Sequence, residues 1–192
     1  MTAIDPQHQP EAPRERRLDA RRNLAAIIEA ARLALAEDPG ASMQDIAERA
    51  GLHRATVHRH FSSREDLVHA VTEASYAEAE RRLAEANIES GDARAALQRA
   101  TRALLEVIDR WRLARYGPVF GTASDESRQA MRVLMVALFE RGQQQGTIRT
   151  DLEPAAMSIA WGGLLSVALA YFETMDIDAA ADLIVQVLLG PP

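Results

Sequence analysis

Apolar residues recur along this chain at the spacing of an α-helix, and no stretch sustains the apolar–polar alternation of a half-buried strand. Ala, Leu, Arg and Glu, which favour helices, recur throughout. The 192 residues suffice for one domain, or for a small module joined to a larger one, with a sizeable core. Cys is absent. The sequence therefore predicts an all-α protein without disulfides, a thiolate nucleophile or sulfur-ligated zinc.

Interruptions in the periodic pattern divide the chain into separate helices. The pattern predicts an amphipathic helix over residues 23–37, two short helices over 43–50 and 54–61, and a long helix from about residue 64 to 87. Further helices are expected near residues 96–111, 131–143, 155–172 and 178–189. Asp38-Pro39-Gly40 is a strong stop signal for the first helix. The Ser at 42 and the pair at 62–63 resemble helix N-caps.

Residues 155–172 contain no charged residue and approach the length of a membrane-spanning helix. The segment is only weakly hydrophobic, with five Ala, two Ser and the pair Gly162-Gly163, and acidic rather than basic residues flank it. We therefore expect a buried helix that meets a second subunit, and no membrane partner. Because the first twenty residues hold no apolar stretch typical of a signal peptide, a cytoplasmic location is expected.

The distribution of charge matters more than the net charge of −6. Residues 14–22 carry five Arg against two acids, and residues 42–64 carry four Arg against two acids, together with three His. From residue 73 onward, 12 Arg stand against 17 acids. All 22 basic residues of the chain are Arg, whose planar guanidinium suits bidentate contacts to phosphate. Positive charge is thus concentrated around the two short helices.

The two short helices have the spacing of a helix-turn-helix. Ala47 permits the helices to cross closely, and Gly51 supplies the positive φ of a tight turn. The residues expected to face inward are Ile46, Ala47, Ala50, Leu52, Val57 and Phe61. The residues left outside on the second helix are Arg54, Ala55, Thr56, His58, Arg59 and His60. This outer surface is rich in donors, has no carboxylate and fits a major groove, where Arg pairs bidentately with guanine.

The same segment allows two other interpretations. A short Arg-rich helix is also compatible with a merely solvated surface. A catalytic or metal site would use His53, His58 and His60 with Asp45 and Glu48. Residues two apart on a helix, however, lie roughly 200° apart, so His58 and His60 cannot chelate one ion from a regular helix. No nucleophile motif or phosphate-binding loop accompanies them. We therefore expect no enzyme activity, no catalytic or metal residues and no cofactor.

The segment SMQDIAERAGLHRATVHRHFSSREDLVHAV, residues 42–71, closely resembles the DNA-binding segment of the TetR family of regulators. GTIRTDLEPAAMSIAWGGLL, residues 146–165, is similar to the entry to that family's dimerisation helices. Pro, Gln and charged residues dominate residues 1–13, which predicts a disordered lead-in. The resemblance implies a three-helix, helix-turn-helix DNA-binding domain over residues 14–67. A C-terminal helical ligand-binding and dimerisation domain is expected over residues 68–192.

The resemblance also implies which residues contact DNA. They are Met43, Gln44, Arg54, Ala55, Thr56, His58, Arg59, His60 and Arg64. We assign base edges to Arg54 and Arg59, and phosphates to Thr56, His60 and Arg64. His58 departs from the family pattern, in which Tyr is usual, and His60 is alternatively an interior histidine. The arm of residues 14–22 either enters the minor groove or stays near phosphates, and we favour the second.

By the same resemblance, the C-terminal part holds a ligand pocket and a dimer interface. The candidate pocket residues are Tyr76, Leu104, Ile108, Trp111, Tyr116, Phe120, Met131 and Met135, although such a stripe also suits a plain core. The candidate dimerisation residues are Trp161, Gly162, Gly163, Leu165, Leu169, Leu183 and Val187. Arg112 and Arg115 could meet an acidic ligand group, or simply be solvated.

The expected function is that of a transcriptional regulator, with repression as the family default. It would bind a palindromic operator in double-stranded DNA as a homodimer and be released by a small-molecule effector of unknown identity. Such release needs a ligand that binds more tightly to a conformation in which the spacing of the two recognition helices does not match the operator half-sites. The alternative is a helical, dimeric interaction protein that does not bind DNA.

Overall fold

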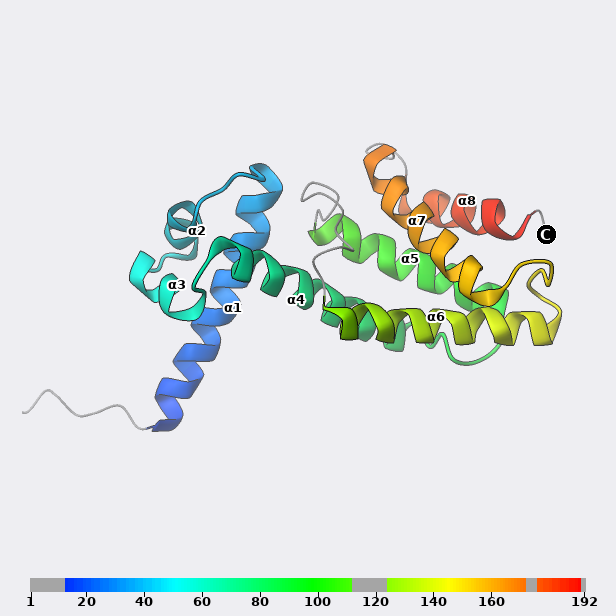
Figure 1. The fold of residues 1–192 in the computed structure, drawn as a ribbon, viewed down its shortest axis with the longest axis horizontal. Coiled ribbons are helices and arrows are strands. Elements are labelled where there is room, and N and C mark those ends of the chain that lie inside the picture. The colour runs from blue at the N-terminus through cyan, green and yellow to red at the C-terminus, as the bar shows by residue number, and fades with distance from the viewer. Residues whose placement is uncertain (1–12, 112–123, 172–175, 191–192) are drawn as a thin grey trace, which may run out of the picture.

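The computed structural model describes residues 13–111, 124–171 and 176–190, and within these ranges it consists of α-helices with no strand (Figure 1). The helices are α1 (Pro13–Glu37), α2 (Met43–Ala50), α3 (Arg54–His60), α4 (Arg64–Glu85), α5 (Ala93–Trp111), α6 (Asp125–Gln145), α7 (Pro154–Tyr171) and α8 (Ile177–Leu189). The predicted all-α class is confirmed, and the order of the helices is the predicted one.

The molecule is elongated, with α1 to α3 at one end and α5 to α8 at the other (Figure 1). Helix α4 starts in the first group and runs into the second. Helix α1 packs against α2 and α4, and α5 packs against α4, α6, α7 and α8. One apolar core continues through both groups, from Ile27 of α1 to Leu188 of α8. The predicted division at residues 67/68 falls inside α4 and stays a prediction.

The short helices of the N-terminal end are fixed by local signals. Ser42 is the N-cap of α2: its hydroxyl accepts from the N–H of Asp45 at 3.3 Å, and the Asp45 carboxylate accepts from the N–H of Ser42 at 2.8 Å. Ser63 and Asp66 form the same capping box at the start of α4. Gly51 ends α2 with φ of 66°, a conformation that glycine adopts without strain. The predicted caps and turn are confirmed.

Helix α1 differs from the sequence-based expectation. It begins at Pro13, about ten residues before the predicted start, so residues 14–22 are helical and not a loose arm. Proline suits the first turn of a helix because its missing N–H would have no partner there. Residues 1–12, which hold nearly all of the predicted lead-in, lie outside the described residues. The basic residues of this segment are therefore presented by a helix that projects beyond the N-terminal group (Figure 1).

The C-terminal helices end within a few residues of their predicted limits. Gly146 ends α6 with φ of 71°. Gly142, inside α6, allows the following loop to fold back, because a Cβ at that position would lie 2.4 Å from Cδ1 of Ile148. Among the described helices, none is long and apolar enough to cross a membrane, α7 included.

Candidate DNA interface, ligand cavity and subunit face

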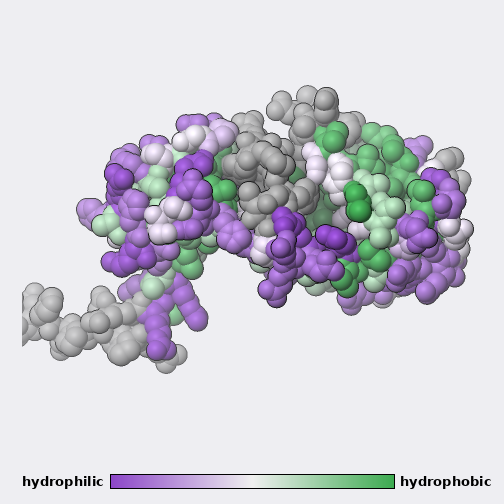
Figure 2. Space-filling view, viewed as in Figure 1, coloured by the Kyte–Doolittle hydropathy of each residue, from purple (hydrophilic) through white to green (hydrophobic). Residues whose placement is uncertain are grey.

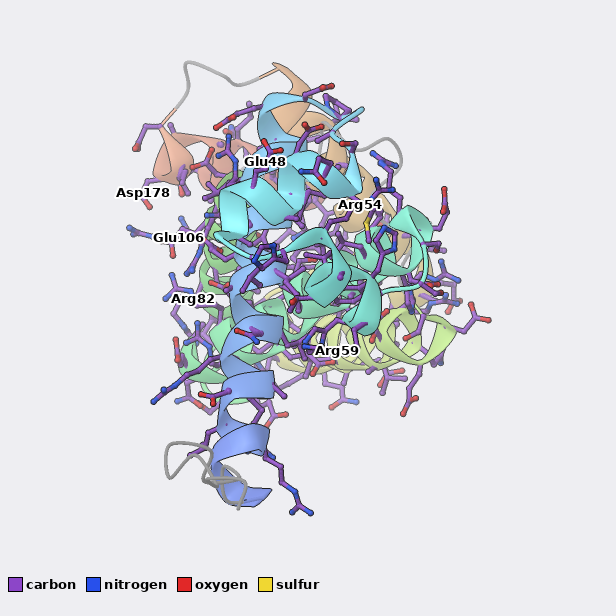
Figure 3. All side chains as sticks on the ribbon, turned by 90° about the vertical axis from the view of Figure 1, so that its left-hand side faces the viewer. Glu48, Arg54, Arg59, Arg82, Glu106 and Asp178 are labelled. Carbon is purple, nitrogen blue, oxygen red and sulfur yellow. The ribbon has the colours of Figure 1, made fainter. Side chains whose placement is uncertain are left out.

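The outer face of α3 carries the donors that the sequence predicted. Arg54, Ala55, His58 and Arg59 are exposed, whereas Val57 is fully buried against the other helices. Val57 therefore anchors α3 and turns its remaining side chains outward. Figure 3 looks on to this end of the molecule and labels Arg54 and Arg59 on the one short helix. Figure 2 shows the same end as mostly hydrophilic surface.

The two guanidinium groups of α3 are not tied to acidic groups. Nε of Arg54 donates to Nε2 of His58 at 3.2 Å, one turn along the same helix. Arg59 makes no hydrogen bond or ion pair with another residue in the described ranges. On α2, the exposed Gln44 side chain donates to Glu48 at 2.7 Å. Helix α3 itself has no acid, so its outer face is cationic and available to a polyanion.

Four of the predicted DNA contacts are not presented in this way. The side chain of Met43 is buried in the core, so only the backbone of that residue lies at the start of α2. Nε of Arg64 donates to the Ala41 carbonyl at 3.1 Å, and the same guanidinium also donates to the Pro39 carbonyl. Nε2 of His60 is buried without a hydrogen-bond partner among the described residues, and Thr56 is half-buried. Arg64 thus fixes the loop before α2 through two hydrogen bonds to its backbone. The side chain of His60 is half-buried.

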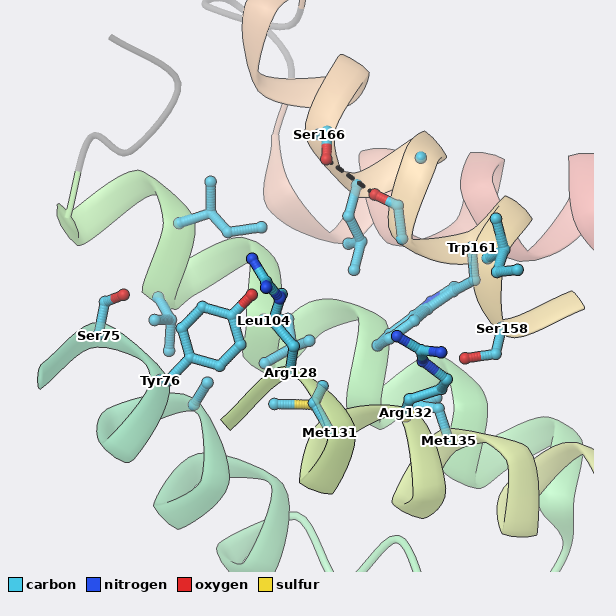
Figure 4. A pocket seen from close by; sticks show the side chains of 17 residues that line it. Ser75, Tyr76, Leu104, Arg128, Met131, Arg132, Met135, Ser158, Trp161 and Ser166 are labelled. Atoms are coloured by element: carbon cyan, nitrogen blue, oxygen red, sulfur yellow. Dashed lines mark hydrogen bonds between the residues drawn. The ribbon is translucent and has the colours of Figure 1, made fainter. Parts of the chain in front are cut away.

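A cavity of about 400 Å³ opens between α4, α5, α6 and α7 (Figure 4). Five predicted pocket residues line it: Tyr76, Leu104, Ile108, Met131 and Met135. Tyr116 and Phe120 lie outside the described residues. Trp111 does not line the cavity, because its Nε1 donates to Glu78 at 2.9 Å between α5 and α4. The size and largely apolar wall are those of a small-molecule site.

Several residues of the cavity wall were not predicted from the sequence. Arg128 and Arg132 enter from α6, and Ser158 and Ser166 enter from α7. Four residues expected at the subunit interface also line the cavity: Trp161, Gly162, Gly163 and Leu165. A signal for the two Arg was present, because Arg128, Met131, Arg132 and Met135 follow the three- and four-residue spacing of one helix face.

The carboxylate of Glu73 holds the start of α6 against α4 beside the cavity. It accepts from the N–H of Ser124 at 2.5 Å and from the hydroxyl of Ser127 at 2.7 Å. Burial alone would raise the pKa of Glu73, but these hydrogen bonds outweigh it, and the pKa is lowered. Burial raises the pKa of Tyr76 to about 12, so its hydroxyl is neutral near pH 7. The ionised Glu73 of α4 thus holds the N-terminal turn of α6, next to Arg128 on the cavity wall.

A polar joint connects the N-terminal group to the wall of the cavity. The guanidinium of Arg32 on α1 donates to the carbonyl of Arg110, near the end of α5, at 2.5 Å. The same guanidinium also donates to the carboxylate of Glu29 at 2.6 Å. Arg110 in turn donates to Glu78 of α4 at 3.0 Å. Glu78 lies one residue before Ala79, which lines the cavity. These hydrogen bonds connect α4 and α5, which line the cavity, to α1.

Helices α7 and α8 pack on each other and leave large apolar side chains exposed. The predicted Leu183 and Val187 are 38% and 59% exposed, and the sequence analysis missed Ile159 and Val167, which are 70% and 53% exposed. We call Ile159, Gly163, Val167, Leu183 and Val187 the α7/α8 face. Figure 2 shows hydrophobic surface around this part of the molecule.

The other predicted interface residues are placed differently. Trp161 is buried, with its Nε1 donating to the Thr101 hydroxyl at 2.9 Å, and Leu165 is buried as well. Both are interior residues of the subunit, and not the exposed interface residues that the sequence predicted. A methyl group at Gly162 or Gly163 would meet no atom within 4 Å, so packing inside the subunit does not require glycine at either position. The side chain of Leu169 lies outside what the structure describes.

Within the described ranges, no group of three or more His, Asp or Glu side chains is arranged to hold a metal ion.

Comparison with known proteins gives matches at both the sequence and structure levels. A family profile described as "Bacterial regulatory proteins, tetR family" matches residues 27–71, from within α1 to within α4. The HTH-type transcriptional repressor LfrR of Mycolicibacterium smegmatis is 37% identical over 86 residues, which are 45% of this chain and 46% of LfrR. The alignment thus spans about half of that relative. The HTH-type transcriptional regulator NfxB of Pseudomonas aeruginosa is 28% identical over 140 residues, 69% of this chain and 73% of NfxB.

Solved structures extend the match over the C-terminal helices. LfrR in complex with proflavine has a TM-score of 0.69 at 25% identity, covering 89% of this chain and 98% of LfrR. The TetR family regulator PfmR of Thermus thermophilus has a TM-score of 0.71 at 21% identity, covering 85% of this chain and 96% of PfmR. Both therefore share the overall fold of this chain over most of its length.

Proposed function

The chain belongs to the TetR family of transcriptional regulators, and from that premise we propose that it represses transcription by binding an operator in duplex DNA through α3. The observation that carries this proposal is the outer face of α3, where Arg54 and Arg59 are exposed and no acid of α3 competes for them. The capping boxes at Ser42 and Ser63 support it, because they hold α2 and α4, and so the orientation of α3, rigidly.

We assign base contacts to Arg54 and Arg59, and supporting contacts to Gln44, Ala55 and His58. Guanidinium groups pair bidentately with guanine in the major groove, and the Ala55 methyl group suits a thymine methyl. The exposed Arg17, Arg21 and Arg22 of α1 add positive charge on the helix that projects from this end, which favours nearby phosphates. Thr56, Arg64 and the backbone N–H groups at the start of α2 are left for phosphate contacts that fix the register.

The working unit in this proposal is a homodimer. The α7/α8 face supports it, because exposed apolar side chains on two packed helices gain stability when a second copy excludes water from them. Two copies related by a two-fold axis would present two α3 helices to a palindromic operator, with half-sites about 34–36 Å apart or a multiple of that.

Control by a small molecule is the third part of the proposal. The cavity supports it, and LfrR was solved with proflavine bound. An effector that prefers a different position of α4 would act on α1 through Glu78, Arg110 and Arg32, and so change the spacing of the two α3 helices.

The full-length protein should be titrated with labelled duplexes from the DNA beside its own gene, at several salt concentrations, with fluorescence anisotropy as the readout. We expect preferred binding to one palindromic segment, and a linear fall of log affinity with log salt because phosphate contacts release counterions. A helical interaction protein that does not bind DNA would give no saturable signal with any duplex at low salt.

A further inference from the structure

We propose that the effector is an amphipathic anion, with an apolar body inside the cavity and a carboxylate or similar headgroup at Arg128 and Arg132. This inference rests on the proposed ligand control and adds the chemical class of the ligand. It follows from the placement of charge on the cavity wall.

The body of the cavity is apolar. Side chains of α4, α5, α6 and α7 contribute Ala79, Leu104, Val107, Ile108, Met131 and Met135, and Trp161 with Leu165 closes the wall from α7. Such a surface favours burial of a hydrocarbon or aromatic group by the hydrophobic effect. Two methionines make the shape of the wall adaptable, because their unbranched side chains repack easily.

The charge on the wall is of one sign. Arg128 and Arg132 lie four residues apart on α6, so they share one face, and Figure 4 shows both guanidinium groups in the space between α6 and α7. None of the described residues that line the cavity is acidic. Tyr76 adds no negative charge near pH 7, since burial keeps its hydroxyl protonated. The charged side chains of the cavity wall would therefore repel a cationic ligand group.

The two Arg differ in their partners. Arg128 pairs with the fully exposed Asp125, which reduces its charge in part. Arg132 makes no ion pair or hydrogen bond with any residue in the described ranges. The hydroxyl of Ser158, also on the wall, lies in the same part of the cavity in Figure 4. A carboxylate placed here would accept charge-assisted hydrogen bonds from a planar fork, which is the geometry that guanidinium offers best.

The experiment compares three probes that share one hydrocarbon chain: decanoate, 1-decanol and decylammonium. Binding of each to the full-length protein is measured by isothermal titration calorimetry at neutral pH, below the solubility limit of each probe. We expect decanoate to bind about ten times more tightly than 1-decanol, as one charge-assisted contact would provide, and decylammonium to bind most weakly. Equal affinity for decanoate and 1-decanol, tighter binding of decylammonium, or no binding of decanoate would overturn the proposal.

The variant Arg132→Gln assigns the headgroup contact. It should weaken decanoate binding about tenfold and leave 1-decanol binding unchanged, because the apolar wall is untouched. The control is Arg149→Gln, which removes an exposed Arg paired with Asp151 far along the chain and should change neither affinity. Since Arg132 is exposed, the fold should survive, and a thermal melt of each variant checks this. Unchanged decanoate affinity in a folded Arg132→Gln protein would contradict the assignment.

DNA binding separates this inference from the proposed function. Affinity for the operator is measured without any probe. If the protein binds DNA but prefers 1-decanol, the proposed function stands and only the proposed ligand class is wrong. If the protein binds decanoate but no duplex, the proposed function is wrong and the proposed ligand class stands.

Discussion

Helices α2 and α3 bury their apolar side chains inside the subunit and leave cations outside, whereas α7 and α8 leave large apolar side chains outside. Val57 and Ile46 are fully buried, while Ile159 and Val187 are more than half exposed. A solvated cationic surface suits a polyanion, which remains hydrated when bound. An apolar surface suits another protein surface, from which water is excluded. The two ends of the molecule therefore suit different partners, for which we propose DNA at the first end and a second copy of the chain at the other.

The largest effect should come from placing charge on the apolar end. The double variant Val167→Glu and Val187→Glu would bury two carboxylates in the proposed dimer interface, which costs several kcal/mol. We expect at least a thousandfold weaker dimerisation, measured by analytical ultracentrifugation, and a large loss of operator affinity because the two half-sites are no longer linked. Val133→Glu, an equally exposed apolar position on α6, is the control and should leave the dimer intact.

The next largest effect should come from removing the cations of the other end. Arg54→Ala with Arg59→Ala removes two base contacts, each worth about 1–3 kcal/mol. Operator affinity should fall by about a hundredfold or more in gel-shift titrations, and selectivity over unrelated duplexes should disappear. Retention of operator selectivity in a folded, dimeric double variant would refute the assignment of α3 as the reading helix. The control is Arg149→Ala, which removes one exposed Arg outside α3 and should leave operator affinity unchanged.

A smaller effect is expected from weakening the scaffold behind α3. Ser42→Ala removes the side chain that accepts from the Asp45 N–H, and loss of an N-cap costs about 1 kcal/mol of unfolding free energy. Chemical denaturation of wild type and variant measures this difference. Ser90→Ala, at an exposed serine outside the helices, should be neutral. A neutral Ser42→Ala would mean that tertiary packing alone holds α2.

The smallest effect concerns the joint between the two ends. Arg32→Met removes the donor to the Arg110 carbonyl but keeps an unbranched apolar side chain. We expect the response of DNA affinity to an effector to fall a few-fold, corresponding to about 1 kcal/mol of coupling, with little change in either affinity alone. Thermodynamic cycles of DNA and decanoate binding measure this coupling. If the coupling between decanoate and DNA binding is unchanged in the variant, the Arg32–Arg110 hydrogen bond does not transmit it.

The N-terminal end could be predicted in detail because its signals are local. Ser42 with Asp45, Gly51 and Val57 each act within a few residues of themselves, through a cap, a turn and a helix face. Spacing in the sequence therefore indicated their structure. The role of Arg64 could not be found in this way, because its partners are carbonyls 23 and 25 residues earlier in the chain.

The C-terminal end was predicted less well, for a physical reason. Helix α7 is apolar on all sides, so its sequence contains no periodic contrast between a buried and an exposed face. Trp161 and Leu165 were therefore expected outside and lie inside, while Ile159 and Val167 were overlooked. Arg128 and Arg132 were missed because a charged pair on an amphipathic helix is usually solvated, and only the approach of α7 makes them part of a cavity wall.

Hydroxyl-radical footprinting of the dimer on DNA from beside its own gene tests most directly whether two α3 helices read duplex DNA together. We expect two protected half-sites on one face of the duplex, with centres about 34–36 Å apart or a multiple of that distance, both lost in the Arg54→Ala, Arg59→Ala variant. A single unpaired footprint, or protection that the variant retains in full, would contradict the account.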